Sequence, residues 1–178
     1  MARAIDYALY LVTDRAAARG RGLVEIVRAA VQGGTSVVQI RDKDTSTRDT
    51  LRLALELKAL LDPLGVPLIV NDRIDLALAC GAAGVHLGQD DLPCELARRP
   101  VGADCLIGVS VSTPEAARRA PGGGAGYLGG SPGFHTPTNR GTPQRTRLAG
   151  AGAHRGPPTP APTPHTRPPN SHHGGGRG

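Results

Sequence analysis

The chain has 178 residues, which is enough for one domain with a sizeable core and short for two. Its net charge of +6 comes entirely from one end: residues 1–138 hold fifteen basic and fifteen acidic side chains, whereas residues 139–178 hold six Arg and no acid. This balance argues against nucleic-acid binding by a folded domain, and no apolar run reaches the roughly 18 residues of a membrane span. The three cysteines lack CxxC spacing, so we expect reduced thiols in a cytoplasmic protein.

Apolar runs of strand length alternate with helical spacings along the first 138 residues. The patterns predict strands at 7–13, 36–40, 66–70, 84–88, 105–110 and 126–134. They predict helices at 23–34, 50–65, 73–81, 94–99 and 112–120. Strands separated by helices imply parallel pairing with right-handed crossovers, so the fold is either a doubly wound open sheet or a (β/α)8 barrel.

Two observations favour the barrel. No GxGxxG or GxxxxGK[ST] stretch follows the first strand, as a nucleotide-binding open sheet would require. Polar side chains instead follow strand after strand, which is typical of an active site built at the C-terminal face of a barrel. They are Thr13, Asp14, Arg41, Lys43, Asn71, Asp72, Asp90, Asp91 and Ser110. We therefore predict an α/β fold of the TIM (β/α)8 type, reduced to about six βα units in residues 1–138.

Residues 139–178 have a different composition. They contain eight Pro, eight Gly and one large aliphatic side chain, Leu148, so they cannot bury enough apolar surface to offset the entropy of ordering. We predict a disordered low-complexity tail and hypothesise that a change of reading frame near residues 129–139 produced it. A genuine disordered extension is the alternative. A barrel with only six strands would have open edges on its first and sixth strands, where a second copy of the chain could pair.

The stretch VVQIRDKD suggests what the mouth of the barrel binds. Gln39, Arg41 and Lys43 occupy every second position, so in a strand they would point into one volume. Arg and Lys suit phosphate oxygens, and two carboxylates beside them, Asp72 and Asp91, suit Mg²⁺ bridging a diphosphate. The alternative is that these carboxylates merely pair with the cations. His86 lies on the fourth predicted strand, either as a packed core imidazole or as part of the site.

Five stretches resemble, in order and spacing, the thiamine phosphate synthase family. They are QIRDKD, VND followed by RIDLA, GVHLGQDD, IGVSVST and YLGGSPGFHTPT, and the resemblance runs from about residue 7 to residue 138. It implies a Mg²⁺-dependent transferase that joins a hydroxymethylpyrimidine diphosphate to a thiazole phosphate, giving thiamine phosphate and pyrophosphate. Its partners would be these small molecules, with no nucleic acid and no membrane.

The resemblance also implies roles for individual residues. The pyrimidine diphosphate would be held by Gln39, Arg41, Lys43, Asn71 and Ser110, of which Arg41, Lys43 and Ser110 would act on the leaving diphosphate. Asp72 and Asp91 would be the Mg²⁺ ligands. The thiazole phosphate would face Thr136, Pro137 and Thr138.

The sequence departs from the family near the sixth strand. Ser131 stands where a glycine is expected, Gly130 and Gly133 stand where apolar residues are expected, and Asn139 replaces a lysine. Nothing after Asn139 resembles the family's seventh and eighth strands, whose loops commonly form the phosphate site in such barrels. We therefore expect impaired activity.

The residues leave two alternatives to the synthase function open. A thiazole tautomerase on the same fold would not need the combined cations and carboxylates, and an inactive fragment would share only the fold. Non-specific binding of nucleic acid by the tail is disfavoured, because its Arg residues have no aromatic residues between them.

Overall fold

The computed structural model describes residues 5–130, which alternate between six parallel strands and five α-helices. The strands are β1 (Tyr10–Val12), β2 (Val37–Ile40), β3 (Leu68–Asn71), β4 (Gly84–Leu87), β5 (Leu106–Val111) and β6 (Tyr127–Gly130). The helices are α1 (Leu23–Gln32), α2 (Thr47–Leu61), α3 (Ile74–Cys80), α4 (Cys94–Val101) and α5 (Pro114–Arg119). Short 3-10 turns, η1 (Asp62–Leu64) and η2 (Ala120–Gly123), follow α2 and α5.

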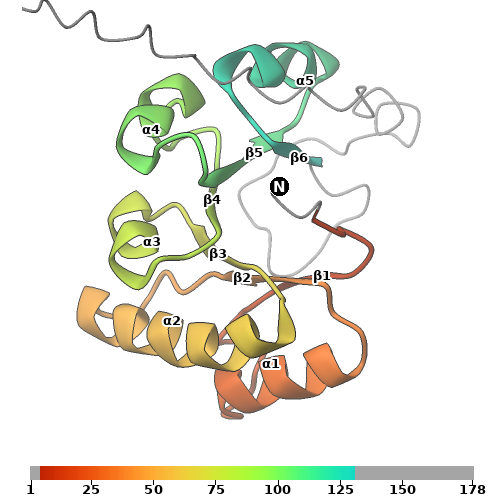
Figure 1. The fold of residues 1–178 in the computed structure, drawn as a ribbon, viewed down its shortest axis with the longest axis vertical. Helices are drawn as coiled ribbons and strands as arrows, with labels where there is room; N and C mark the ends of the chain where they lie inside the picture. The colour runs from red at the N-terminus through yellow and green to blue at the C-terminus, as the bar shows by residue number, and fades with distance from the viewer. Residues whose placement is uncertain (1–4, 131–178) are drawn as a thin grey trace, which may run out of the picture.

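The strand order distinguishes the two predicted sheet types. Each strand pairs in parallel with the next one along the chain, in the order β1-β2-β3-β4-β5-β6. A doubly wound sheet would reverse its order at a switch point and carry helices on both faces. Here the helices form an outer arc around the curved sheet (Figure 1), so the described part is a six-stranded parallel half-barrel.

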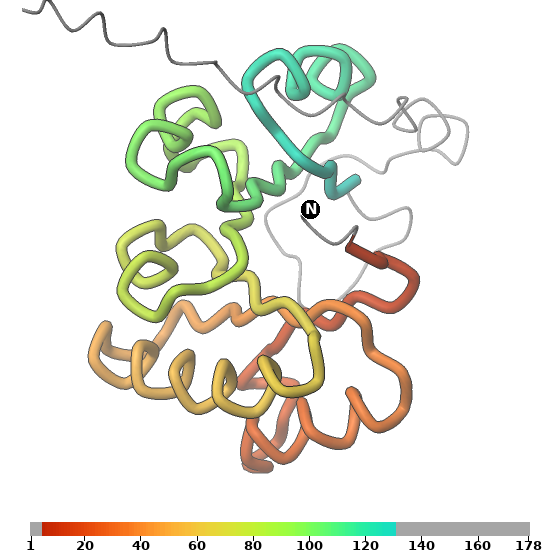
Figure 2. Tube along the Cα trace, in the orientation of Figure 1, coloured from red at the N-terminus to blue at the C-terminus, as the bar shows by residue number. Residues whose placement is uncertain are grey.

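The curvature brings the first and last strands of this sheet together across its inner side. The hydroxyl oxygens of Tyr10 on β1 and Tyr127 on β6 lie 2.6 Å apart, although 117 positions separate them in the sequence. Their rings are also in tilted contact, with centroids 5.8 Å apart. Figure 2 shows both strands bordering the inner space of the half-barrel.

Alternation within the strands separates an apolar outer face from a more polar inner face. Side chains of the outer face pack against the helices in one core, which includes Val38, Ile40, Leu68, Val70, Val85, Leu87 and Ile107 from the strands and Ala54, Leu57, Leu61, Leu76 and Ala97 from the helices. The positions between them carry Gln39, His86 and Ser110, among others. Because adjacent strand residues point to opposite faces, one short strand supplies both the core and the inner surface.

The helix ends follow their capping residues. The Ser46 hydroxyl accepts a hydrogen bond from the Asp49 amide at 3.2 Å, so α2 begins at Thr47, three residues before the predicted start. Thr113 caps α5 in the same way, so this helix begins at Pro114, two residues after the predicted start at 112. Helix α4 continues through Pro100 to Val101, two residues beyond the predicted end.

The described residues end at Gly130, the last one assigned to β6, so residues 131–134 of the predicted sixth strand lie outside them. The predicted tail, residues 139–178, lies outside them too. Within residues 5–130, no helix is long and apolar enough to cross a membrane.

Candidate active site

Lys43 and Asp72 form an ion pair at the carboxyl ends of β2 and β3. The distance from Lys43 Nζ to Asp72 Oδ2 is 3.2 Å, and the Lys43 side chain is 57% exposed. Asp72 has a φ of 61°, a left-handed backbone conformation that Asp tolerates better than most residues. Its backbone N–H donates to the carbonyl of His86 on β4 at 2.8 Å. This turn places the Asp72 carboxylate beside the cation.

Asp91, in the loop after β4, brings a second carboxylate to the same place. The Gly88 amide donates to Asp91 Oδ2 at 2.6 Å, which holds the carboxylate against the end of β4. A Cβ on Gly88 would lie 2.9 Å from that oxygen, so a larger residue here would push the Asp91 carboxylate away from this position. Burial raises the pKa of Asp91. A hydrogen bond with Asp72 and the negative charge of Asp72 raise this pKa further, while the positive charge of Lys43 lowers it. The two carboxylates therefore form one site with Lys43.

The structure corrects the prediction that alternation directs Gln39, Arg41 and Lys43 into one volume. Strand β2 ends at Ile40, so only Gln39 obeys the two-residue period. Gln39 is 4% exposed and donates from Nε2 to the Tyr10 hydroxyl at 2.8 Å, whereas Lys43 pairs with Asp72. Gln39 therefore belongs to the inner face of the sheet, and Lys43 to the site at the strand ends.

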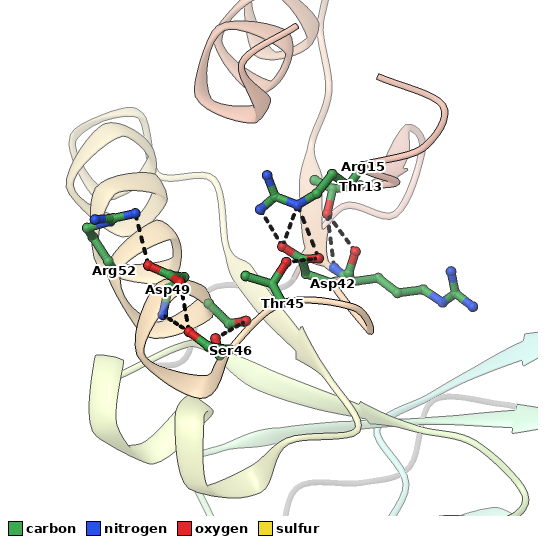
Figure 3. Close-up of polar contacts among 9 residues, drawn as sticks. Thr13, Arg15, Asp42, Thr45, Ser46, Asp49 and Arg52 are labelled. Atoms are coloured by element: carbon green, nitrogen blue, oxygen red, sulfur yellow. Dashed lines mark hydrogen bonds and ion pairs between the residues drawn. The ribbon is translucent and has the colours of Figure 1, made fainter. Parts of the chain in front are cut away.

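Short polar contacts hold the loops after β1 and β2. Thr13 Oγ1 accepts from the Arg41 amide at 3.0 Å, which ties the two strand ends together. Arg15 Nε donates to Asp42 at 3.0 Å, and Thr45 Oγ1 donates to the same carboxylate at 2.7 Å (Figure 3). These contacts fix the loop that carries Arg41 and Lys43.

His86 on β4 joins two other strands through its ring. Its Nε2 lies 2.9 Å from Ser110 Oγ on β5, and its Nδ1 lies 3.0 Å from the Tyr127 hydroxyl on β6. Burial lowers the pKa of His86, although the negative charge of Asp91 raises it. His86 is therefore half-buried and contacts Ser110, one of the predicted site residues.

The remaining predicted residues take different positions. Asn71 is the last residue of β3 and lies opposite His86 in the strand register, next to Asp72. Ser110 lies near the end of β5, opposite Gly129. Thr136, Pro137 and Thr138 lie outside the described residues.

Comparison with known proteins identifies the family. Residues 9–156 match the family described as thiamine monophosphate synthase. The chain belongs to this family. The resemblance in the sequence covers residues 7–138. The family match begins two residues later, at 9, and ends 18 residues later, at 156.

Curated relatives carry the same description. The thiamine-phosphate synthase of Syntrophomonas wolfei is 52% identical over 143 residues, covering 80% of this chain and 68% of the relative. That of Albidiferax ferrireducens is 55% identical over 134 residues, covering 75% of this chain and 61% of the relative. The chain thus spans about three fifths to two thirds of the length of these thiamine monophosphate synthase relatives.

A solved structure supports the fold of this family member. The thiamine phosphate pyrophosphorylase from Pyrococcus furiosus superposes with a TM-score of 0.67 at 39% identity. The superposition covers 72% of this chain and 61% of that chain.

The donor set at the strand ends fits Mg²⁺. Asp72 and Asp91 offer adjacent carboxylate oxygens, the hard ligands that this ion prefers. Among residues 5–130, no group of three or more His, Cys, Asp or Glu side chains could enclose a metal ion. Two carboxylates without a complete protein cage suit Mg²⁺, which usually keeps waters or substrate phosphates as its other ligands.

Sequence reasoning missed the tyrosines that meet at the inner face. Tyr7 and Tyr10 lie near the start of the chain and Tyr127 near the end of the described part, and the ring centroids of Tyr7 and Tyr127 are 5.1 Å apart. Burial and, to a smaller extent, Tyr10 together raise the pKa of Tyr7 to about 12. Burial also raises the pKa of Tyr127 well above its ordinary value. Only the inward position of Tyr10 in the strand alternation could have indicated this cluster.

Proposed function

We propose that this chain is a transferase that makes thiamine phosphate. It would join 4-amino-2-methyl-5-hydroxymethylpyrimidine diphosphate to a thiazole phosphate. The bond between the pyrimidine methylene carbon and the diphosphate oxygen breaks, and pyrophosphate leaves with the electron pair. The lone pair of the thiazole nitrogen then forms the new carbon–nitrogen bond. No protein nucleophile is needed in this sequence of steps.

The observation that carries the proposal is the Lys43, Asp72 and Asp91 cluster at the ends of β2, β3 and β4. A cation beside two carboxylates suits a diphosphate that arrives with a divalent ion, and the curated relatives named thiamine-phosphate synthase are about half identical to this chain. A thiazole tautomerase would have no use for this combination.

The residues of the chain would bind and orient the pyrimidine diphosphate. The ammonium group of Lys43 is exposed and can contact phosphate oxygens, and Arg41, in the same loop, can add a bidentate contact. Ser110 would hydrogen-bond the same substrate. Positive groups held in place before the reaction stabilise the charge that develops on the leaving diphosphate. Mg²⁺ held by Asp72 and Asp91 would neutralise further charge on the diphosphate when bound.

We also propose that the six βα units belong to a barrel of the (β/α)8 type. The sequential strand order and the helices on the outer side support it, as does the Pyrococcus furiosus structure. In such barrels, active sites lie at the carboxyl ends of the strands, where Lys43, Asp72 and Asp91 meet.

The test is an assay of the purified 178-residue chain with both substrates and Mg²⁺. Thiamine phosphate and pyrophosphate should appear in equal amounts. Asp72→Asn keeps a residue that tolerates the left-handed backbone, yet it should reduce kcat/KM by about 100-fold because the site loses a charged ligand.

The matched control is Asp75→Asn, three residues after Asp72. This change removes an exposed carboxylate that pairs with Arg73 and lies outside the proposed site. It should leave the rate unchanged. Absence of product from the unsubstituted chain, or equal losses in the two variants, would contradict the proposal.

A further inference from the structure

An unbroken series of hydrogen bonds crosses the inner face of the half-barrel and ends at Ser110. Gln39 Nε2 lies 2.8 Å from the Tyr10 hydroxyl, which lies 2.6 Å from the Tyr127 hydroxyl. The Tyr127 hydroxyl lies 3.0 Å from His86 Nδ1, and His86 Nε2 lies 2.9 Å from Ser110 Oγ. Five side chains from β2, β1, β6, β4 and β5 take part. We call this series the inner polar chain.

The strand register and one glycine make this series possible. Gly108 on β5 lies between His86 on β4 and Tyr127 on β6, because it is the register partner of both. A Cβ on Gly108 would lie 2.1 Å from Cζ of Tyr127 and 2.4 Å from its hydroxyl oxygen. The Tyr127 ring therefore lies across the bare backbone of β5, which is how its hydroxyl reaches a histidine two strands away.

The direction of the hydrogen bonds follows from the Gln39 end. An amide nitrogen can only donate, so the Tyr10 oxygen accepts from Gln39 and its proton goes to Tyr127. The Tyr127 oxygen then accepts, and its own proton goes to His86 Nδ1. An imidazole that accepts at Nδ1 carries its proton on Nε2, and that proton points to the Ser110 oxygen.

The opposite direction would leave a proton without an acceptor. If Tyr127 donated to Tyr10, the Tyr10 oxygen would accept twice, and its own proton would have no partner among the hydrogen bonds of residues 5–130. Both tyrosine side chains are largely buried, where an unpaired hydroxyl is costly.

We propose that Tyr10, Tyr127 and His86 are positioning residues that fix the hydroxyl of Ser110 as a hydrogen-bond donor toward the ligand. Because the Ser110 oxygen accepts from His86, its proton is directed away from the ring, and the group it meets must be an acceptor. This inference rests on the proposed function, in which that group belongs to the pyrimidine diphosphate. A fully ionised diphosphate offers only acceptors, which matches a Ser110 hydroxyl whose proton is directed toward the ligand.

The first test measures the tautomer of His86 in the full chain without any substrate. Histidine labelled with ¹⁵N reports which ring nitrogen carries the proton, and the signals of His86 are assigned by their loss in His86→Gln. We expect a neutral ring with the proton on Nε2. Tyr127→Phe should move the Nδ1 resonance, whereas Tyr7→Phe, which removes a hydroxyl from the same aromatic cluster, should not. A proton on Nδ1 would overturn the proposal.

The second test asks whether Tyr127 acts through Ser110. Binding of the pyrimidine diphosphate with Mg²⁺ is measured by calorimetry for Tyr127→Phe, Ser110→Ala and the double variant. Each single change should weaken binding by about threefold to tenfold, as the loss of one hydrogen bond would. The double variant should bind no more weakly than Ser110→Ala alone, because Tyr127 would then have no hydroxyl left to direct.

Additive losses in that cycle would show that Tyr127 supports the fold rather than the orientation of Ser110, and would overturn the proposal. Tyr7→Phe serves as the control in this test as well and should bind as the unsubstituted chain does. If the unsubstituted chain does not bind the pyrimidine diphosphate, the proposed function fails, while the tautomer of His86 still decides whether the inner polar chain has the stated direction.

Discussion

The outer and inner faces of the sheet use the same strands for different purposes. On β2, Val38 and Ile40 point outward into the core beneath the helices, while Gln39 between them points inward to Tyr10. The outer face is apolar and its side chains are almost fully buried. The inner face carries hydroxyls, an amide and an imidazole that are paired with one another. The fold therefore depends on one face, and the proposed chemistry on the other.

This difference predicts that the two faces respond differently to substitution. On the outer face, side-chain volume matters most, because close packing tolerates neither voids nor excess atoms. On the inner face, the hydrogen-bonding groups and the space that admits them matter most. Changes on the outer face should alter the free energy of unfolding, and conservative changes on the inner face should alter binding.

The largest effect should come from Gly108→Val, which fills the space that admits Tyr127. A Cβ there would lie 2.1 Å from the Tyr127 ring, so the ring must move away and its hydrogen bonds with Tyr10 and His86 must break. We expect a loss of at least about 3 kcal/mol in the free energy of unfolding, at the upper end of overpacking, together with loss of substrate binding. Urea unfolding followed by circular dichroism measures the first quantity.

The control for this change is Gly122→Ala. Gly122 lies in η2, and a Cβ there would meet no atom within 4 Å. This variant should unfold as the parent does. A Gly108→Val protein with parental stability would show that the inner face has room that the structure does not show.

Leu57→Ala should have the next largest effect and should separate stability from activity. Leu57 lies on α2, is fully buried and belongs to the core of the outer face. Its truncation should cost about 2–5 kcal/mol of unfolding free energy, while KM for the pyrimidine diphosphate stays at the parental value under conditions where the variant is folded. Leu55→Ala, on the exposed side of the same helix, should change neither quantity substantially.

The order of elements could be predicted from the sequence because it depends on short-range patterns. Alternating apolar runs and helical spacings located the six strands and the five helices. Polar residues after successive strands also indicated the site, because parallel strands end at one edge. The pairing of Lys43 with Asp72 had been considered as the alternative to ligand binding, and the structure shows this pair.

The inner polar chain could not be predicted in this way. Its members come from five strands, and the contact between Tyr10 and Tyr127 depends on how strongly the sheet curves. The space above Gly108 depends on the register between β4, β5 and β6. Neither curvature nor register is encoded in the period of a single strand, and the end of β2 at Ile40, which separates Gln39 from Lys43, is not visible in that period either.

The smallest effect should be a pH dependence of stability from the loop after β2. Burial raises the pKa of Asp42, but hydrogen bonds from Arg15 and Thr45 and the charge of Arg15 outweigh it and hold this pKa below its ordinary value of 3.8. A carboxyl whose pKa is lower in the folded state stabilises the fold above its unfolded pKa, and this contribution disappears as the pH falls through the folded pKa. The Asp42 side chain is only 1% exposed, but Arg15 is half exposed and water screens the pair from that side, so we expect about 1 kcal/mol.

Urea unfolding of Asp42→Asn at pH 7 and at pH 3 checks this expectation. The variant should be slightly less stable than the parent at pH 7, and this difference should narrow at pH 3, because pH 3 lies below the ordinary pKa of 3.8 at which the unfolded chain takes up the proton. The difference in stability between Arg15→Gln and the parent should also narrow from pH 7 to pH 3, because either change removes the ion pair. The double variant should show the same pH dependence as each single variant. A gap that persists unchanged at pH 3 would mean that Asp42 acts through its packing and its hydrogen bond with Thr45 rather than through its charge.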